Sequence, residues 1–315
     1  MILILTSKDD ATADYVTARL RPSAYVRLNS EDLPSALTIE STATGSAITF
    51  GRRRFEPTDF TGVWYRRPKA IRFKHRADPG ARSHAAAEFT AALEGFLALI
   101  PEGRWINHPA RNVLAGHKLE QVRRAAALGF KVPRTLITQD AKRLREFWEL
   151  CGGDVIIKPL STGYIERATP SEDSLIYTNR LRRSDLMRTT VIRRCPTLFQ
   201  ERIAKSADIR ITVVDRNLQA IELTATDEGE LRLDIRRNNM VDVKHRATTL
   251  PVAVVNQIHR LLAAYGLRFA AIDMIRDVHS NHVFLEVNPN GQWAWLDMAG
   301  ASNSRDHLIA ALQKS

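Results

Sequence analysis

The stretch RFAAIDMIRDVHSNHVFLEVNPNGQWAWLD, residues 268–297, decides how this chain is expected to fold. Two apolar runs, at 269–275 and 282–287, flank a short polar segment. Apolar runs of this length on either side of a polar break are typical of two antiparallel strands joined by a turn. The sequence therefore predicts a β-hairpin close to the carboxyl terminus.

The register of this hairpin follows from where its turn lies. A turn centred at residues 279–280 places Asp273 opposite Glu286, and Ile275 opposite Phe284. Directly opposed side chains in such a ladder have Cβ atoms about 4.5–5.5 Å apart. The two carboxylates are therefore expected to be neighbours on one face of the hairpin.

A third oxygen donor joins this acidic pair. Asn288 lies two residues beyond Glu286, so it projects from the same face of the strand. Two half-buried carboxylates this close are costly unless a cation neutralises them. Ligands that are all oxygens favour Mg²⁺, which completes its shell with phosphate and water. We predict a magnesium site at Asp273, Glu286 and Asn288, in preference to a surface hairpin that tolerates an acidic pair.

Length and composition limit the class of protein. The 315 residues are 44% hydrophobic and 26% charged, which is typical of a soluble globular enzyme with two or three lobes. No apolar run approaches the roughly 18–20 residues that span a membrane, and the first ten residues do not resemble a signal peptide. The two cysteines, Cys151 and Cys195, have no CxxC spacing. We expect a reduced, cytoplasmic enzyme without a disulfide framework or zinc site.

The charge balance points to an anionic partner. The net charge is +11 and the pI is about 10.0, which suits nucleic acid, an anionic membrane or an acidic peptide. Charge does not choose among these three. The sequence shows no helix-turn-helix, zinc finger or RNP-type aromatic motif, so we expect neither nucleic acid nor membrane as partner.

Residues 1–105 alternate strand and helix patterns and predict a small α/β lobe with a partly parallel sheet. Strands are expected at 2–5, 24–28, 47–50, 52–54 and 62–66, and helices at 11–20, capped by Asp9 or Asp10, and 81–99. The last strand ends in Arg66-Arg67-Pro68. Strand ends in such sheets often face a ligand crevice. A ligand contact and simple solvation of these arginines both remain open.

The middle of the chain contains a second informative stretch. A helix is expected at 110–128, containing Lys118 and closed by Gly129; a strand follows at 135–138, and a helix capped by Asp140 ends at 150. A buried strand at 155–158 ends in Lys158, which must reach an anion or solvent. The next loop, STGY at 161–164, has the small residues that let backbone amides approach phosphate, although it is a weaker signal than a Walker motif.

A basic segment and several strands complete the chain. The arginines of the segment are Arg180, Arg182, Arg183, Arg188, Arg193 and Arg194. Either they form a solvated face or they attract an acidic partner, which we slightly favour. Further strands are expected at 197–203, 207–214, 218–224 and 230–235, then a helix at 251–265 ending at Gly266, and a last helix capped by Asp306.

Together these motifs resemble ATP-grasp ligases, and most closely the microviridin-type or graspetide ligases that tailor ribosomally made precursor peptides. The motifs are GVWYRRP at 62–68, NHPARNVLAGHKLEQ at 107–121, VIIKPL at 155–160, LFQERI at 198–203, DIRITVVD at 208–215 and FLEVNPNGQWAWLD at 284–297. The last is the most specific. The resemblance implies an α/β (α+β) ATP-grasp fold, with an N-terminal pre-ATP-grasp domain at 1–106, a central subdomain at 107–205 and a C-terminal subdomain with the metal site at 206–315.

The resemblance also implies roles for individual residues. ATP contacts are implied for Lys118 and Lys158 (phosphates), Ser161 and Gly163 (phosphate loop), Glu201, Arg202 and Ile203 (adenine hinge) and Asp208 (ribose). Arg210 is implied near the transferred phosphate as the catalytic residue, and Asp273, Glu286 and Asn288 as ligands of two Mg²⁺ ions. Peptide contacts are expected at Arg66, Arg67, Arg182, Arg183, Arg188 and Arg236. The loop after Lys158 has less glycine than many family members, which leaves its phosphate contacts open.

The implied reaction activates an Asp or Glu side chain of a precursor peptide as an acyl phosphate. A Ser, Thr or Lys side chain of the same peptide then closes an ω-ester or ω-amide macrocycle. A precursor with a leader and a homodimer are implied as partners. A glutathione-synthetase-like ligase for small substrates is the alternative. A degenerate nucleotide-responsive protein or a nucleic-acid binder is disfavoured, because the lysines, hinge acid, arginine and metal oxygens are all present.

Overall fold

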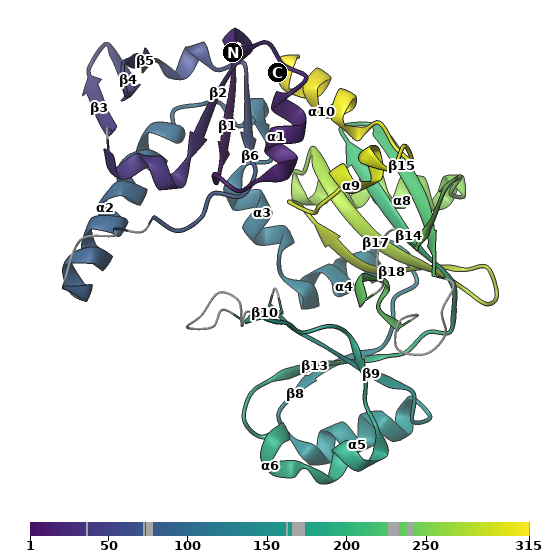
Figure 1. Ribbon diagram of the computed structural model, residues 1–315. Helices are drawn as coiled ribbons and strands as arrows, with labels where there is room; N and C mark the ends of the chain where they lie inside the picture. The colour runs from purple at the N-terminus through teal and green to yellow at the C-terminus, as the bar shows by residue number, and fades with distance from the viewer. Residues whose placement is uncertain are drawn as a thin grey trace.

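A computed structural model describes residues 1–35, 37–71, 73, 78–161, 163–165, 174–225, 233–237 and 242–314, which form three lobes (Figure 1). The two chain termini lie near each other at the top of that view. None of the helices in these ranges is long and apolar enough to cross a membrane.

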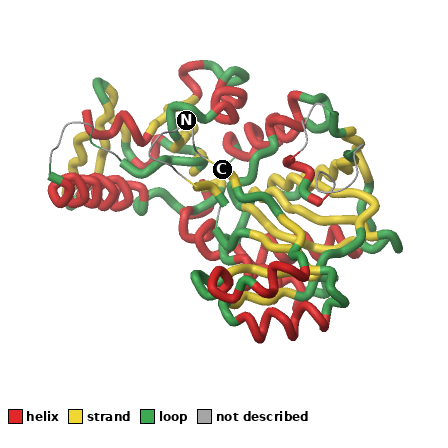
Figure 2. Tube along the Cα trace, turned by 60° about the horizontal axis from the view of Figure 1, so that its bottom comes forward, coloured by secondary structure: helices red, strands yellow, loops and turns green. Residues whose placement is uncertain are grey.

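The amino-terminal lobe is built on a parallel sheet. Its strand order is β2 (Tyr25–Asn29), β1 (Ile2–Thr6), β6 (Gly62–Tyr65) and β7 (Trp105–Ile106). Helix α1 (Ala11–Thr17) begins at Asp10, whose carboxylate accepts the Thr12 and Ala13 amides, and it ends earlier than expected. The long helix α2 (Pro79–Leu97) projects at the left of both views (Figure 1; Figure 2). A meander of β3 (Leu37–Thr42), β4 (Gly45–Phe50) and β5 (Arg53–Phe55) completes the lobe; β3 is exposed and lacks the apolar run that would have predicted it.

The central lobe is a small antiparallel sheet with a core of its own. Its strand order is β12 (Asn179–Arg180), β9 (Val155–Lys158), β13 (Thr197–Glu201) and β8 (Thr135–Thr138). The helices α5 (Ala141–Leu150) and α6 (Thr189–Ile192) and the pair β10 (Tyr164–Ile165) and β11 (Ser174–Leu175) complete it. Its buried core contains Leu144, Phe147, Val155, Leu181, Leu186 and Phe199.

The single helix expected at 110–128 is wrong, because the chain forms two helices there. α3 (Pro109–Ala115) ends at Gly116, and α4 (Lys118–Ala127) begins after the extended residue His117. Glycine is a poor helix former, and the Gln121 side chain donates to the freed Ala115 carbonyl at 2.5 Å. Lys118 is therefore the first residue of a helix rather than an interior one. The same Gln121 side chain accepts the Val287 amide and donates to the Val287 carbonyl, which fixes α4 on the carboxyl-terminal lobe.

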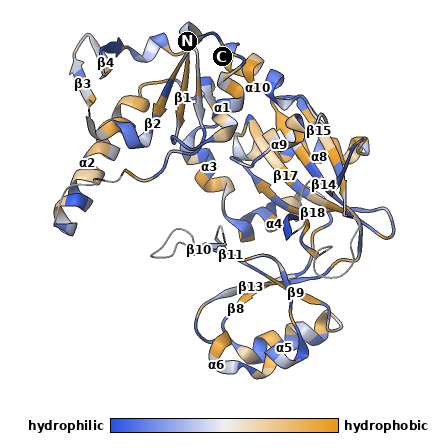
Figure 3. Cartoon of the chain, viewed as in Figure 1, coloured by the Kyte–Doolittle hydropathy of each residue, from blue (hydrophilic) through white to orange (hydrophobic). Residues whose placement is uncertain are grey.

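The carboxyl-terminal lobe is a five-stranded antiparallel sheet. Its strand order is β16 (Lys244–Thr248), β15 (Asn217–Thr224), β14 (Lys205–Val214), β17 (Phe269–Asp277) and β18 (His282–Asn288). Residues Ile209, Ile211 and Val213 of β14 pack in the core with α8 (Val252–Tyr265). Alternation along the strand sends Asp208 and Arg210 to the opposite face. Figure 3 shows the hydrophobic colouring that runs along β1, β2 and β17.

The hairpin of β17 and β18 has the predicted register only at the end that carries Asp273 and Glu286. Asp273 faces Glu286, but Ile275 faces Val283, and Phe284 faces Met274. A β-bulge next to Asp273 puts one extra residue in β18 and shifts the outer register by one. The bulge lets Phe284 stay fully buried against Phe130, with ring centroids 5.4 Å apart.

Two other expectations need correction, and one helix was not expected. Half of the strand expected at 230–235 lies outside the described residues, and Ile235 begins a 3-10 helix, Ile235–Arg237. Helix α10 (Ser304–Gln313) follows Asn303, and Asp306 lies in its first turn. The capping carboxylate is instead Asp297, which accepts the Ser304 and Arg305 amides. It comes from the short helix α9 (Ala294–Met298), which the sequence pattern did not predict.

Candidate active site

A large cavity lies between the central and carboxyl-terminal lobes, with a volume of about 1990 Å³. Pockets for single small ligands are usually about 300–1,000 Å³, so this cavity has room for more than one. The residues from the nucleotide and metal predictions that line it are Lys118, Lys158, Ser161, Glu201, Arg202, Ile203, Asp208, Arg210, Asp273, Glu286 and Asn288. Residues far apart in the sequence are thus brought into one cavity.

The floor of the cavity carries the two opposed carboxylates. Asp273 is flanked by Glu286 on β18 and by Arg210 on β14. An Arg210 nitrogen donates to Asp273 Oδ1 at 2.7 Å, and the Lys118 Nζ lies 3.9 Å from Glu286 Oε2. Both carboxylates keep an oxygen for other partners, and Asn288 adds its amide on the same face. This donor set of oxygens alone fits a hard divalent cation.

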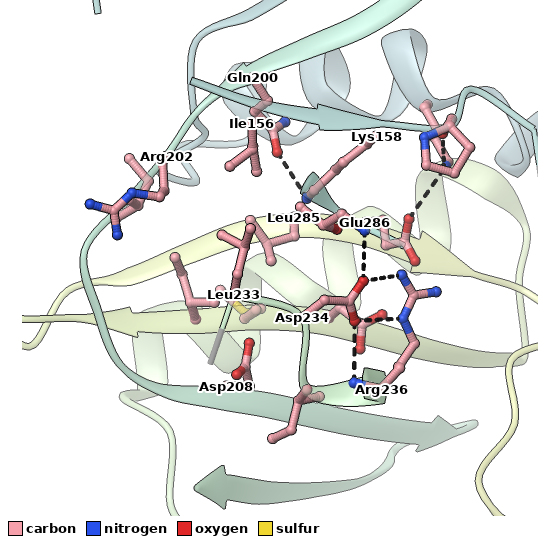
Figure 4. Close-up of a pocket in the computed structure, with 18 of the residues that line it drawn as sticks. Ile156, Lys158, Gln200, Arg202, Asp208, Leu233, Asp234, Arg236, Leu285 and Glu286 are labelled. Atoms are coloured by element: carbon pink, nitrogen blue, oxygen red, sulfur yellow. Dashed lines mark hydrogen bonds and ion pairs between the residues drawn. The ribbon is translucent and has the colours of Figure 1, made fainter. Parts of the chain in front are cut away.

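Lys158 ends β9 in the roof of the cavity. Its Nζ donates to Gln200 Oε1 at 3.0 Å, and Figure 4 shows this bond above Glu286. Burial lowers the pKa of Lys158, and the nearby Glu286 carboxylate opposes that shift. A half-buried cation with one neutral partner suits an anionic ligand such as a phosphate.

Lys118 joins the helix α4 to the loop after β9. Its Nζ donates to the carbonyl oxygens of Pro159 at 2.7 Å and Ser161 at 3.4 Å. Gly163 does not line the cavity. It has φ +72°, and a Cβ there would lie 2.8 Å from Pro159 Cγ. The glycine therefore serves the turn geometry, and the cavity-facing part of this loop is Ser161.

Residues 201–203, at the end of β13, form one edge of the cavity. The Glu201 amide donates to the Arg134 carbonyl and the Arg202 amide to the Asp154 carbonyl, each at 2.9 Å. No hydrogen bond joins the Ile203 amide to another residue in the described part of the chain. The apolar side chains of Ile156, Met274 and Leu285 line the same cavity. An edge with an unused amide beside apolar walls suits a planar heterocycle.

Asp208 has a partner that the sequence pattern did not reveal. Both of its carboxylate oxygens accept hydrogen bonds from Lys205 Nζ, at 2.8 and 2.7 Å. Burial raises the pKa of Asp208, and the Lys205 ammonium opposes that rise. Three further cavity residues were also missed: Gln200, Asp234 and Gln292. The alternation that places Gln200 on the same face as Arg202 was a usable signal, whereas Asp234 lies in an irregular segment without periodicity.

Asp234 connects the two lobes that enclose the cavity. It accepts the Thr178 amide of the central lobe at 2.9 Å and a bidentate ion pair from Arg236, at 2.8 and 2.6 Å (Figure 4). Burial opposes ionisation of this carboxyl, but these donors outweigh it and hold the pKa of Asp234 well below its usual range. Arg237 adds a bond to Asn179 Oδ1 at 2.6 Å.

The arginines expected to bind a peptide separate into three groups. Arg67, Arg182 and Arg236 line the cavity, whereas Arg183 and Arg188 do not. Arg66 is only 1% exposed, so its expected direct contact with a peptide is wrong. Its guanidinium donates hydrogen bonds inside the protein, to the Asn290 carbonyl and to the Gln292 side chain.

Two family models match the chain. The MvdD pre-ATP-grasp domain matches residues 1–112, and the ATP-grasp domain of prokaryotic glutathione synthetase matches residues 124–288. The second covers more than half of the chain, so the chain belongs to the ATP-grasp family. It is an ATP-grasp ligase with an amino-terminal domain of the MvdD pre-ATP-grasp type. No curated protein matches the sequence.

Solved structures share this fold over the whole chain. The RiPP-associated ATP-grasp ligase of Chryseobacterium gregarium, in complex with ADP and a leader and core peptide, is 26% identical, with TM-score 0.86 and 99% and 94% of the two chains covered. Macrocyclase MdnB from Microcystis aeruginosa MRC is 26% identical, with TM-score 0.78 and 99% and 98% covered. Macrocyclase MdnC from the same source, bound with precursor peptide MdnA, is 23% identical, with TM-score 0.85 and 100% and 99% covered.

Proposed function

We propose that this ligase uses ATP to activate Asp or Glu side chains of a ribosomally made precursor peptide as acyl phosphates, releasing ADP. A hydroxyl or amine of the same peptide then attacks the acyl carbon, expels phosphate and closes an ω-ester or ω-amide macrocycle. The observation that carries this proposal is the large cavity, which combines phosphate-binding cations, a metal-type oxygen set and exposed arginines. The likeness to peptide-bound ATP-grasp ligases supports it.

The chain's own residues divide the work of phosphoryl transfer. Lys118 and Lys158 hold the ATP phosphates beside Ser161; the hinge of Glu201, Arg202 and Ile203 holds adenine, and Asp208 the ribose. Phosphoryl transfer needs mainly positioning and neutralisation of charge. Arg210 faces the same cavity and stabilises the transferred phosphate and the oxyanion of the attack.

Magnesium fits the oxygen donors of Asp273, Glu286 and Asn288. Solved relatives are bound with Mg and ADP, or with AMPPNP. When bound, the metal neutralises the phosphate charge. We propose two ions, because the side chains of Asp273, Glu286 and Asn288 offer up to five oxygens, enough for two octahedral ions to share while phosphate and water complete their shells.

The peptide is proposed to enter this cavity. Arg67, Arg182 and Arg236 line it and offer a positive field to an acidic core segment. Arg183 and Arg188 lie outside the cavity lining and would act at longer range. A leader segment, a homodimer and a cytoplasmic location remain part of the proposal; the two unpaired thiols Cys151 and Cys195 suit that reducing compartment.

The test supplies Mg²⁺, ATP and candidate precursor peptides from the neighbouring genomic region. We expect ADP release that depends on the peptide, with loss of one water per ring by mass spectrometry. Ring formation would be lost when the reacting Asp or Glu is changed to Asn or Gln. ADP release with free amino acids and no peptide would instead support the glutathione-synthetase-like ligase, whose ATP-grasp model matches this chain.

A further inference from the structure

The Arg66-Arg67-Pro68 element at the end of β6 contains the most deeply buried arginine of the described residues. Burial lowers the pKa of Arg66 to about 10, so its guanidinium remains charged at neutral pH. A buried charge is costly unless its hydrogen-bond partners are well placed. The partners of Arg66 therefore indicate what the residue is for.

Those partners lie in the carboxyl-terminal lobe, in the loop that follows the metal-ligand residue Asn288. One terminal nitrogen of Arg66 donates to the Asn290 carbonyl at 2.6 Å, and the other to Gln292 Oε1 at 2.6 Å. Arg67 donates to the same Asn290 carbonyl at 3.1 Å. The Asn290 amide in turn donates to Asn288 Oδ1 at 3.0 Å. The amino-terminal lobe thus holds the loop that carries a predicted metal ligand.

Gln292 connects Arg66 with Arg210 through hydrogen bonds. Its side-chain oxygen accepts from Arg66 and from Thr12 Oγ1, the latter at 2.8 Å. Its main-chain carbonyl accepts from Arg210 at 2.6 Å. Arg210 has its other terminal nitrogen on Asp273 Oδ1. The amide side chain and the carbonyl of one residue therefore link the amino-terminal lobe to the guanidinium that faces the cavity.

The geometry of the loop leaves little room for other arrangements. A Cβ on Gly291 would lie 2.9 Å from an Arg210 nitrogen and 2.4 Å from Ala271 Cβ. Asn107 also donates to the Pro289 carbonyl at 3.1 Å, from a buried side chain. Asp10 lies 3.6 Å from the Arg66 Nε and keeps the charge balanced.

We propose that Arg66 is a positioning residue that, with Thr12, holds Gln292 and the 288–292 loop so that Arg210 and Asn288 lie in their working arrangement. This inference rests on the proposed role of Arg210. It gives the arginine motif of the amino-terminal lobe a part in the reaction without any contact with substrate.

The test compares Arg66→Met and Thr12→Val with the controls Arg82→Met, on the exposed side of α2, and Thr17→Val, at the end of α1. We expect kcat for ADP release to fall at least tenfold in Arg66→Met and about threefold in Thr12→Val, with the KM for ATP within twofold. Without nucleotide or metal, amides 290–293 should exchange hydrogen faster in both variants. Both controls should match the wild type.

Coupling separates positioning from general destabilisation. If Arg66 acts through Arg210, adding Arg66→Met to Arg210→Lys should lower kcat by less than twofold. A further tenfold loss in that background would overturn the proposal, as would wild-type kcat and exchange in folded Arg66→Met. If Arg66→Met does not fold, Thr12→Val decides by the same two measurements. Hydrogen exchange needs neither precursor nor turnover, so failure to find a macrocycle would count against the proposed function and leave this test intact.

Discussion

The two walls of the active-site cavity are attached to the rest of the molecule in different ways. The carboxyl-terminal lobe shares one hydrophobic core with the amino-terminal lobe, in which Ile4 and Trp64 pack with Phe269, Trp293 and Leu308. The central lobe has a core made only of its own residues. Its described connections to the carboxyl-terminal lobe include polar ones, such as Thr178 to Asp234 and Arg237 to Asn179.

This difference assigns different mobilities to the two walls. A shared apolar core resists separation, because burial of apolar surface is the main stabilising contribution in proteins. A lobe attached through polar contacts is expected to move relative to its neighbours. We therefore expect the wall that carries Arg210 and the metal-type oxygens to stay fixed, and the wall that carries Lys158 and residues 201–203 to move when a ligand binds.

The largest effect is expected on the fixed wall, from Glu286→Gln. The amide keeps the shape of the side chain but removes one of two negative charges from the proposed metal site. We expect ADP release at saturating Mg²⁺ to fall about a thousandfold, which corresponds to roughly 4 kcal/mol. Glu88→Gln, on the exposed face of α2, is the matched control. Full turnover in Glu286→Gln would remove the metal assignment.

Two matched leucine-to-alanine changes, one in each core, test whether the cores are separate. Leu144 and Leu308 are fully buried leucines in helices α5 and α10, one in each core. Each change to alanine should cost about 2–5 kcal/mol of unfolding free energy. Leu144→Ala should lower the stability of the central lobe alone, and Leu308→Ala that of the other two lobes, as measured by hydrogen exchange in urea. Equal destabilisation of all three lobes by both variants would show one cooperative unit.

A smaller effect is expected where the fixed wall is most tightly packed. Gly291→Ala forces a Cβ toward the Arg210 guanidinium, and misplacement by about 1 Å costs up to about a hundredfold in rate. We expect kcat to fall roughly 10–100-fold, with little change in the KM for ATP. Gly95→Ala, where a Cβ meets nothing within 4 Å, is the control. Unchanged kcat in Gly291→Ala would mean that Arg210 has another position in which it works.

The smallest effect concerns the link between the walls. Asp234→Asn weakens the bonds to Arg236 and Thr178. We expect the population of molecules in which the central lobe has moved away from the carboxyl-terminal lobe to rise roughly fivefold at pH 7. The pKa of Asp234 in the folded protein lies below its unfolded value of about 3.9. The stabilisation from the ionised Asp234 carboxylate is therefore fully present above about pH 3.9 and is lost as the pH falls through the folded pKa. The wild type should therefore approach the variant in acid.

The separation of the two lobes in the wild type and in Asp234→Asn can be measured by double electron–electron resonance between two spin labels. One spin label is placed at the exposed Cys195 of the central lobe and one at Val252→Cys of α8, with Cys151→Ser in the background. Lys142→Gln, on the outer side of α5, is the control. Identical distance distributions for the wild type and Asp234→Asn at pH 7 would show that this link does not control closure.

Much of the cavity was predictable from residues close together in the chain. Strand alternation placed Asp208 with Arg210 on one face, and a two-residue spacing placed Glu286 with Asn288. Local patterns failed where a single residue changed the geometry, as at the break after Gly116 and the bulge beside Asp273. They also missed Gln200, whose partner Lys158 lies on the neighbouring strand, and Lys205, which bonds to Asp208 across a register shift in β14.

By itself, the sequence determined the acidic face of the hairpin, because side chains alternate along a strand and a turn fixes which residues are opposed. The role of the arginine motif was decided only by tertiary structure. Arg66 reaches Asn290 across 224 positions of the chain. No local periodicity encodes such a contact, since it depends on two lobes packing through a shared core. That packing changes Arg66 from a candidate peptide contact into the buried support of the 288–292 loop.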